Sequence, residues 1–341
     1  MKSKSVTRTT GMVLGKFMPP HLGHVYLFEF AKNYVDDLAI VVETQRDQPI
    51  PGKLRFNWVR EMFPDVQVLH LTDENPQEPS EHPDFWKIWQ HSLNRILPFE
   101  PDFLFASEQY GWKLAEVMNA KFIPVDVDRN IMPVSGTEVR NDPLGNWKYI
   151  PRVARPYFAK RICIFGPEST GKSTLCKQLA AHFETVYVPE YARTHIEMHS
   201  KHCGHELSLD DIPLIARGQM AAEDAIAFNA NRVLFCDTDL TATTIWSEWL
   251  FKSCPTWIAK EADRRHYDLY LLTDVDVPWV DDVVRYLPEE RTSFLERCKH
   301  ELKSRNRDFV LLSGDWQTRF DTAVRAVGRV LANHSEKDSS V

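Results

Sequence analysis

The sequence predicts an α/β protein built from two doubly wound parallel sheets, one in each half of the chain. Each half alternates short apolar runs with helical patterns, and strands separated by helices favour a parallel sheet covered on both faces. The length of 341 residues suits about two domains. The segment Ile150–Pro156 has two prolines around charged residues and predicts a linker, so we expect domains at residues 1–152 and 153–341.

Five apolar runs in the first half predict strands, and the helical patterns between them predict helices. The expected strands are Gly11–Leu14, Leu38–Glu43, Val66–Leu71, Asp102–Ala106 and Phe122–Val125. The expected helices are Gly23–Tyr34, Lys53–Phe63, Phe85–Leu97 and Gln109–Asn119. The stretch Thr72–Pro83 is rich in Pro, Glu and Asp, which predicts a loop near a binding edge.

The second half repeats this alternation after the expected linker. Its expected strands are Lys160–Phe165, Thr185–Val188, Arg232–Cys236, Leu269–Thr273 and Phe309–Leu312. Its expected helices are Lys172–His182, Asp210–Ala230 and Trp316–Ala332. Both halves therefore have enough alternating elements to form a sheet and a core of their own.

Composition narrows the class of protein. The net charge of −7 gives no global attraction to nucleic acid or to an anionic membrane. No apolar run approaches the roughly 18 residues of a membrane helix, and the polar start lacks the apolar core of a signal peptide. All six cysteines lie in the second half, and Cys163 and Cys236 sit in strand-like runs, as reduced buried cysteines do. We expect a cytoplasmic protein, and the sequence leaves open whether it forms a homo-oligomer.

The segment Gly166–Ser173 fits the phosphate-binding pattern G-x-x-x-x-G-K-[ST] at every fixed position. It directly follows an expected strand and begins an expected helix, so backbone N–H groups and the helix N-terminus can face phosphate. Lys172 can bridge the β- and γ-phosphates of ATP, and Ser173 can place its hydroxyl on Mg²⁺. The expected phosphate-binding residues are Gly166, Glu168, Ser169, Thr170, Gly171, Lys172, Ser173 and Thr174.

Two carboxylates follow strand ends in the same half, where open α/β sheets bind ligands. Asp237 can contribute to the Mg²⁺ site, and Glu190 can accept the proton of an acceptor hydroxyl. The alternatives are a helix cap for Asp237 and an acid stabilised by a helix dipole for Glu190. Tyr191 and Arg193 follow Glu190 and are expected to face the phosphate acceptor.

Two further clusters lie in the second half. Trp279 stands among turn residues, with Arg285 and Arg291 after it, which suits a mobile lid that stacks on a flat ring and meets phosphate charge. The alternative is a surface helix with ordinary ion pairs. The segment His199–His205 contains His199, His202, Cys203 and His205, at a spacing open to zinc. We expect a solvated loop there, because no second ligand pair stands at zinc-finger spacing.

The segment Gly15–His24, GKFMPPHLGH, connects the first expected strand to the first expected helix. His21 and His24 can donate N–H groups to phosphoryl oxygens, and Gly23 lets the backbone approach a ligand. Downstream, VSGTEVR begins with a capping pattern whose helix N-terminus can also donate to phosphate, and Arg140 can reach a leaving pyrophosphate. The pattern predicts phosphoryl or nucleotidyl transfer.

GKFMPPHLGH with VSGTEVR resembles the signature of the HxGH nucleotidyltransferase superfamily. The order of this domain, a short linker, then GPESTGKST, PEYAR, DTD and PWV, resembles the bifunctional NadR family over about residues 10 to 330. The resemblance implies a Rossmann-like nucleotidyltransferase domain and a P-loop kinase domain. It implies nicotinamide mononucleotide adenylyltransferase and ribosylnicotinamide kinase activities, with ATP, nicotinamide riboside and nicotinamide mononucleotide as substrates, NAD as product and Mg²⁺ as cofactor.

The resemblance also implies residue roles. His21 and His24 would stabilise the α-phosphate of ATP, and Glu190 or Asp237 would orient the riboside hydroxyl. Trp279 would stack on the nicotinamide ring. The ATP-binding residues of the first domain would be Gly15, Lys16, Phe17, Gly23, Thr137 and Arg140.

Two departures from the family pattern affect these expectations. Some NadR members begin with a helix-turn-helix domain, and Met1–Thr10 leaves no room for one, so we expect no nucleic-acid partner. Gly136 stands where another small side chain or a hydroxyl is common. Two alternatives stay open: a nucleotidyltransferase–kinase fusion for another nucleoside, or an ATP or NAD sensor without full activity.

Overall fold

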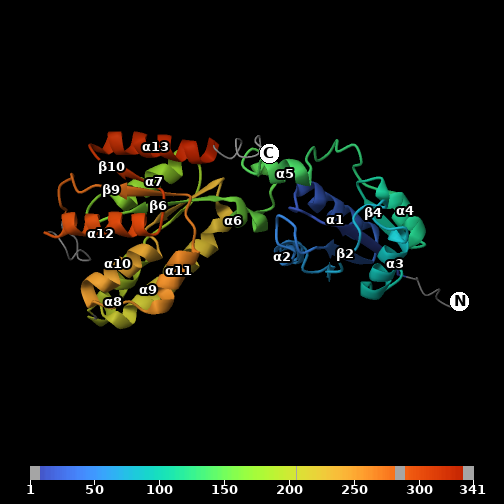
Figure 1. Cartoon of the computed structure of the whole chain (residues 1–341), viewed down its shortest axis with the longest axis horizontal. Coiled ribbons are helices and arrows are strands. Elements are labelled where there is room, and N and C mark those ends of the chain that lie inside the picture. Colours follow the sequence, from blue (N-terminus) through green and yellow to red (C-terminus); the bar gives the residue numbers. More distant parts are fainter. Residues whose placement is uncertain (1–7, 205, 281–288, 333–341) are drawn as a thin grey trace. The chain divides into compact units, whose positions relative to one another are not determined.

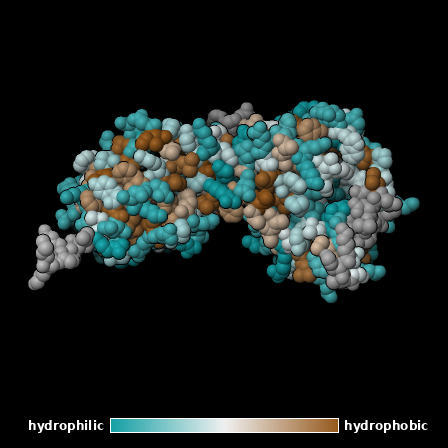
Figure 2. Space-filling view, turned by 180° about the vertical axis from the view of Figure 1, so that it is seen from behind, coloured by the Kyte–Doolittle hydropathy of each residue, from teal (hydrophilic) through white to brown (hydrophobic). Residues whose placement is uncertain are grey.

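The computed structural model describes residues 8–204, 206–280 and 289–332. The chain divides into two compact units, Met1–Ala154 and Arg155–Val341, each with a sheet and helices of its own (Figure 1). Hydrophilic residues cover much of the face shown in Figure 2, with hydrophobic residues in small groups between them, which agrees with most apolar side chains being inside the units. Within the described residues, no helix is long and apolar enough to cross a membrane.

Unit 1 contains a five-stranded parallel sheet in the order β3-β2-β1-β4-β5. Its strands are β1 (Thr10–Gly15), β2 (Asp37–Glu43), β3 (Gln67–Leu71), β4 (Phe103–Ala106) and β5 (Lys121–Pro124). Its α-helices are α1 (Leu22–Tyr34), α2 (Gly52–Met62), α3 (Phe85–Ile96), α4 (Tyr110–Val117) and α5 (Gly136–Asn141). The chain leaves β1 toward β2 and later returns to the other side of β1 with β4. This reversal makes the carboxyl end of β1 the expected ligand-binding point of a doubly wound sheet.

Alternation along β1 explains how both faces of this sheet are covered. Val13 points to a core cluster with α1 and α2, whereas Met12 and Leu14 point to a second cluster with α3 and α4. All three side chains are buried. A strand buried on both faces reads as a continuous apolar run, which is why the sequence identified it.

Unit 2 contains a second five-stranded parallel sheet in the order β10-β9-β6-β8-β7. Its strands are β6 (Lys160–Phe165), β7 (Tyr187–Val188), β8 (Val233–Asp237), β9 (Leu269–Thr273) and β10 (Phe309–Leu312). Its α-helices are α6 (Arg155–Phe158), α7 (Lys172–His182), α8 (Tyr191–Cys203), α9 (Ile212–Ile226), α10 (Leu240–Phe251), α11 (Thr256–Arg264), α12 (Arg291–Ser304) and α13 (Trp316–Ala332). Because β6 lies at the centre, the loop that follows it opens at the middle of the carboxyl edge.

The predicted fold class, two parallel α/β sheets, is confirmed. Cys163 and Cys236 are buried and free, as expected. The expected linker at Ile150–Pro156 contains the boundary between the two units, and it is partly helical, because a 3-10 turn over Arg152–Ala154 leads into α6. Proline is tolerated in the first turn of a helix, so the prolines there start turns and break none.

Several helices of unit 2 were not predicted, and α10 shows why. Its sequence LTATTIWSEWLF is apolar or small on every side, so it lacks the amphipathic period that identifies a surface helix. The expected solvated loop at His199–His205 is wrong at its start, because α8 runs to Cys203. The side chains of residues 201–203 and residue 205 lie outside the described part of the chain. Among the described side chains, no group of three or more His, Cys, Asp or Glu residues is placed to hold a metal.

Candidate active sites

In unit 1, the loop after β1 is held by the two histidines of the H-x-G-H motif. His21 is the N-cap of α1, and its Nδ1 accepts the backbone N–H of Gly23 at 3.1 Å. The Nδ1 of His24 accepts the backbone N–H of His21 at 3.3 Å. A Cβ on Gly23 would lie 2.9 Å from the His21 ring, so only glycine fits between them. The loop therefore fixes the orientation of both imidazoles.

This arrangement also fixes where each imidazole carries its proton. Because each Nδ1 accepts a hydrogen bond, the proton of the neutral ring lies on Nε2. Burial lowers the pKa of His21 to about 4 and the pKa of His24 well below its ordinary value, and the positive charge of Arg129 adds to both shifts. The rings lie 3.7 Å apart between centroids. At neutral pH the site therefore presents two uncharged Nε2–H donors side by side.

The downstream motif VSGTEVR lies against the same loop. Ser135 caps α5, as its position in the sequence predicted. The Nη1 of Arg140 donates to the Met18 carbonyl at 2.8 Å, and its Nη2 donates to Thr137 Oγ1 at 3.3 Å. A Cβ on Gly136 would lie 3.2 Å from the Met18 carbonyl oxygen, so the departure at this position accommodates a close approach of the two loops. Two motifs more than 100 residues apart thus form one site.

Sequence reasoning missed two arginines that support this site. Arg55 is fully buried and donates to the carbonyls of Lys16, Ile50 (3.1 Å) and Glu43 (3.2 Å), which ties together the loops after β1 and β2. Arg129 follows β5 and acts electrostatically on the histidines. Neither stands in a recognisable motif; the only signal is that each lies in or beside a loop at the carboxyl edge of the sheet.

Two further residues of the first motif, Gly15 and Phe17, shape the start of the loop. Phe17 is buried with a φ of 44° and stacks edge-on against His24 at 5.0 Å between centroids. A Cβ on Gly15 would lie 2.7 Å from the Phe17 ring. Lys16, between them, lowers the pKa of the buried Glu43 carboxyl against the larger opposing effect of burial. Gly15 and Phe17 thus set the path of the loop, and Lys16 supplies the positive charge.

In unit 2, the segment Gly166–Ser173 forms a loop between β6 and α7 whose shape depends on glycine. Gly166 has a φ of 132°, and Gly171, the N-cap of α7, has a φ of 83°, a region that favours glycine. The Nζ of Lys172 donates to the Pro167 carbonyl at 2.7 Å. The ammonium group is therefore held over the loop, as a phosphate-binding lysine requires.

Asp237 ends β8 beside this loop and is 2% exposed. Burial raises its pKa, while Lys172, a hydrogen bond to the Ser173 side chain and Arg193 oppose the rise. Its Oδ1 is buried without a hydrogen-bond partner among the described residues. The helix cap, the alternative role for Asp237, is Asp239. Its Oδ1 accepts the backbone N–H of Ala242 at 3.0 Å.

Glu190 precedes α8 and is half-buried. It occupies the N-cap position, but its side chain makes no capping hydrogen bond. Burial raises the pKa of Glu190 to about 7, the negative charge of Asp237 adds to the rise, and Lys172 and Arg193 oppose it. The carboxyl group therefore can both accept and release a proton near neutral pH.

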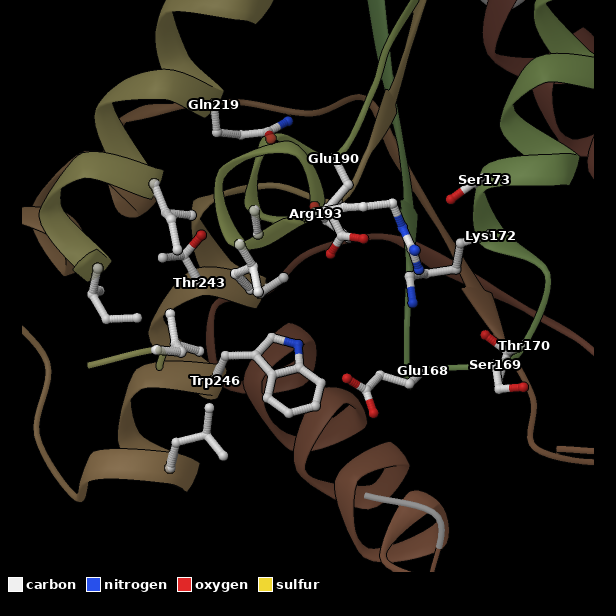
Figure 3. Close-up of a pocket in the computed structure, with 18 of the residues that line it drawn as sticks. Glu168, Ser169, Thr170, Lys172, Ser173, Glu190, Arg193, Gln219, Thr243 and Trp246 are labelled. Atoms are coloured by element: carbon white, nitrogen blue, oxygen red, sulfur yellow. The ribbon is translucent and has the colours of Figure 1, made fainter. Parts of the chain in front are cut away.

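Glu190 and the phosphate loop line an open cavity of about 1100 Å³, a volume that includes the solvent at its mouth (Figure 3). Glu190, Arg193 and the phosphate loop form one part of it, and α9 and α10 form another. Sequence reasoning missed the residues of this second part, two neighbours from α8, and two residues from loops, Leu207 and Thr238. They are Ala192, Ile196, Leu207, Ile212, Ile215, Gln219, Thr238, Ala242, Thr243, Trp246 and Leu250.

Three predicted residues, Tyr191, Trp279 and Arg291, are not among the described residues that line this cavity. Tyr191 packs on Gly218, where a Cβ would lie 2.0 Å from its ring. Trp279 has the Arg291 guanidinium 5.6 Å from its ring centre, and Arg291 donates to the Val277 carbonyl at 3.0 Å. Neither ring is among the described residues that line the cavity, whose aromatic ring is that of Trp246. Arg285 lies outside the described residues.

The chain is 30% identical to the trifunctional NAD biosynthesis/regulator protein NadR of Escherichia coli (strain K12), over 95% of its length and 84% of the relative. The chain belongs to the NadR family. The protein of the same name from Salmonella typhimurium is 28% identical over the same shares. A model of the AAA domain matches residues 161–319, which contain the phosphate loop of this NadR-family chain.

Two solved NadR structures have the same fold as this NadR-family chain. A crystal structure of NadR protein in complex with NR superimposes with a TM-score of 0.78 at 23% identity. A second, in complex with NAD and AMP-PNP, gives 0.76 at 24% identity. Each match covers 95% of this chain and 96% of the other. Each of the two α/β units therefore has the fold found in NadR proteins.

Proposed function

We propose that this chain is a bifunctional enzyme of NAD synthesis. Unit 2 phosphorylates nicotinamide riboside with ATP to nicotinamide mononucleotide, and unit 1 transfers the adenylyl group of a second ATP to that product, which yields NAD and pyrophosphate. The observation that carries the proposal is that a NadR-family chain holds two phosphate-handling sites, each with its reactive groups oriented by backbone contacts. The names of the relatives and the ligands of the solved NadR structures support the choice of substrates.

In unit 1 the proposed reaction is an attack by the phosphate of nicotinamide mononucleotide on the α-phosphorus of ATP. Negative charge grows on the α-phosphoryl oxygens, and the Nε2–H groups of His21 and His24 donate to them. Lys16, Thr137 and Arg140 hold the leaving pyrophosphate. Because the two imidazoles are neutral, this site works by positioned hydrogen bonds and needs no proton transfer from them.

In unit 2 the riboside 5′-hydroxyl attacks the γ-phosphorus of ATP, and ADP leaves. The hydroxyl proton passes to the Glu190 carboxylate, whose pKa near 7 suits a base at neutral pH. Lys172 neutralises charge on the transferred phosphoryl group. Arg193 lines the same cavity, and its guanidinium group can donate to the reacting phosphates. We assign the base to Glu190 and the metal site to Asp237, because Asp237 bonds Ser173 and Glu190 lines the cavity.

The residues around Asp237 fit Mg²⁺, the cofactor expected with ATP. A serine hydroxyl and a buried carboxylate are the oxygen ligands that Mg²⁺ takes beside nucleotide phosphates. The unpartnered, buried Oδ1 of Asp237 supplies an acceptor that a cation would satisfy. When bound, Mg²⁺ would neutralise charge between the β- and γ-phosphates, while Ser173 and Asp237 hold it.

We place both activities in the cytoplasm, because the described cysteines are free and a reducing compartment preserves them. The nucleoside-contact roles of Tyr191 and Trp279 and the phosphate role of Arg285 stay predictions. We assign residues 1–152 to the adenylyltransferase and 153–341 to the kinase, a division that the structural units at Ala154 and Arg155 support.

Chromatography of the purified protein with MgATP tests the proposal. Nicotinamide riboside is supplied in one reaction and nicotinamide mononucleotide in another, and NAD is expected from both. NAD from the mononucleotide alone would overturn the kinase half and leave the adenylyltransferase standing. No NAD from either would overturn the proposed substrates, and other nucleosides and phosphate esters would then be screened.

A further inference from the structure

Gln219 of α9 is a polar side chain in the apolar part of the kinase cavity. It lines the cavity although it is only 3% exposed. Its Oε1 accepts the backbone N–H of Tyr191 at 2.8 Å, and its Nε2 has no hydrogen-bond partner among the described residues. Figure 3 shows Gln219 projecting from one side of the view and Trp246 from the opposite side, with Glu190 and Arg193 between them and the phosphate loop.

The contact with Tyr191 fixes which end of this amide is the nitrogen. A backbone N–H can donate only to the oxygen, so the two possible orientations of the amide are not equivalent here. Two N–H donors and one lone pair of Oε1 are left for another molecule. A buried donor without an acceptor is unfavourable, so the Nε2 of Gln219 needs a partner that the described residues do not supply.

The surroundings of Gln219 restrict what that ligand can be. Ile212 and Ile215 precede it on the same face of α9, at spacings of seven and four residues. Trp246 supplies an aromatic face, and Leu250 lies one turn further along α10. An apolar slot with one oriented amide suits a flat ring that carries a single amide substituent.

We infer that Gln219 determines base specificity in the kinase by pairing with the carboxamide of the nicotinamide ring. Its Nε2–H donates to the carboxamide oxygen, and Oε1 accepts from the carboxamide NH₂. This inference rests on the proposed riboside kinase activity. A carboxylate in the same place would accept from Nε2 but would face Oε1 with a second acceptor, so the acid form of the ring is disfavoured.

The test pairs a change in the substrate with a change in the protein. Phosphorylation by MgATP is measured with nicotinamide riboside, with nicotinic acid riboside and with pyridinium riboside, which lacks the carboxamide. Each substrate is given to the native chain, to Gln219→Met and to Gln219→Glu, which keeps an acceptor for Tyr191. Leu214→Met, on the exposed face of the same helix, is the matched control. The readout is the ratio of kcat/KM between substrates for each protein, so a loss of overall activity does not imitate the effect.

In the native chain and in the Leu214→Met control, removal of the carboxamide is expected to lower kcat/KM by about 10- to 100-fold. In Gln219→Met, kcat/KM for nicotinamide riboside and for pyridinium riboside should differ by less than about threefold. In Gln219→Glu, the new carboxylate would face the carbonyl oxygen of the carboxamide, so the preference for nicotinamide riboside should also fall. Equal substrate ratios in the native chain and both Gln219 variants would overturn the inference while nicotinamide riboside is still phosphorylated. A native chain that phosphorylates none of the three ribosides would instead overturn the proposed kinase function.

Discussion

The two sites use burial in opposite ways. In unit 1, burial lowers the pKa of His21 to about 4 and keeps the imidazole uncharged. In unit 2, burial raises the pKa of Glu190 to about 7 and keeps the carboxyl uncharged in acid. Burial disfavours the charged form in both cases, but the histidine becomes a fixed hydrogen-bond donor and the carboxyl becomes a proton acceptor tuned to neutral pH.

This difference matches what each reaction asks of the protein. A phosphate that attacks ATP is already an anion, so unit 1 has only to orient it and to stabilise growing charge. A ribose hydroxyl must lose its proton, so unit 2 needs a base. The direction of each pKa shift agrees with the proposed task of its group, a neutral donor in unit 1 and a base near neutral pH in unit 2. Because both sites lie on one chain, each activity serves as the internal control for changes in the other.

The largest expected effect is the loss of kinase activity in the variant Lys172→Met. The ammonium group held over the phosphate loop would no longer neutralise the transferred phosphoryl group. We expect nicotinamide riboside phosphorylation to fall about a thousandfold. NAD formation from the mononucleotide, measured on the same preparation, should stay within about twofold. A parallel loss of both activities would show that the sites do not work independently.

The second largest expected effect is a loss of adenylyltransferase activity with the kinase retained. His24→Ala removes one Nε2–H donor, and we expect NAD formation from the mononucleotide to fall about 100-fold or more. The kinase activity should be unchanged. His91→Ala, at an exposed position of α3, is the matched control and should change neither activity. If His24→Ala keeps full adenylyltransferase activity, the assignment of the imidazole as a charge-stabilising donor is wrong.

A change in pH should also affect the two activities differently, with a smaller effect than the substitutions above. As pH falls below about 7, Glu190 takes up a proton and can no longer accept one, so the kinase kcat/KM should fall about tenfold per pH unit. The adenylyltransferase should show no such fall between pH 8 and 5.5, because His21 stays neutral until about pH 4. Glu190→Gln should lower the kinase rate about 100-fold and remove this pH dependence. A variant that keeps the native pH profile would point to another base.

Much of both sites could be predicted from local sequence. The strands β1 and β6 are continuous apolar runs because both of their faces are buried, and each leads directly into its motif. Glycines at 166 and 171 stand where the backbone has a positive φ, so the pattern in the sequence reports the geometry of the loop. The H-x-G-H motif and the phosphate loop could both be placed from the sequence, because each follows a parallel strand and the carboxyl ends of parallel strands lie at one edge of the sheet.

The residues that we propose to contact the base could not be predicted in this way. Trp246 and Gln219 reach the kinase cavity from α10 and α9, and nothing in the sequence shows that these helices lie across one cavity. The period of α10 is hidden because the helix is apolar or small all round. Trp279, an aromatic in a conspicuous turn, was the candidate that the sequence offered; Arg291 lies over its ring, and its stacking role stays a prediction. Packing between distant helices, which local patterns do not encode, decides which aromatic side chain lines the cavity.

The smallest expected effect concerns the contact between the two motifs of unit 1. In Gly136→Ala the new methyl carbon would lie 3.2 Å from the Met18 carbonyl oxygen, closer than most such contacts, so the loop must shift by a few tenths of an ångström. That carbonyl holds the Arg140 guanidinium at 2.8 Å, so the pyrophosphate-binding group shifts with it. We expect the adenylyltransferase KM for ATP to rise about threefold, with the kinase unchanged. Gly328→Ala, where a Cβ meets nothing within 4 Å, should change neither activity. If Gly136→Ala behaves like this control, Met18 does not position Arg140. The two sites would then share backbone-held phosphate-binding groups only at His21, His24 and Lys172.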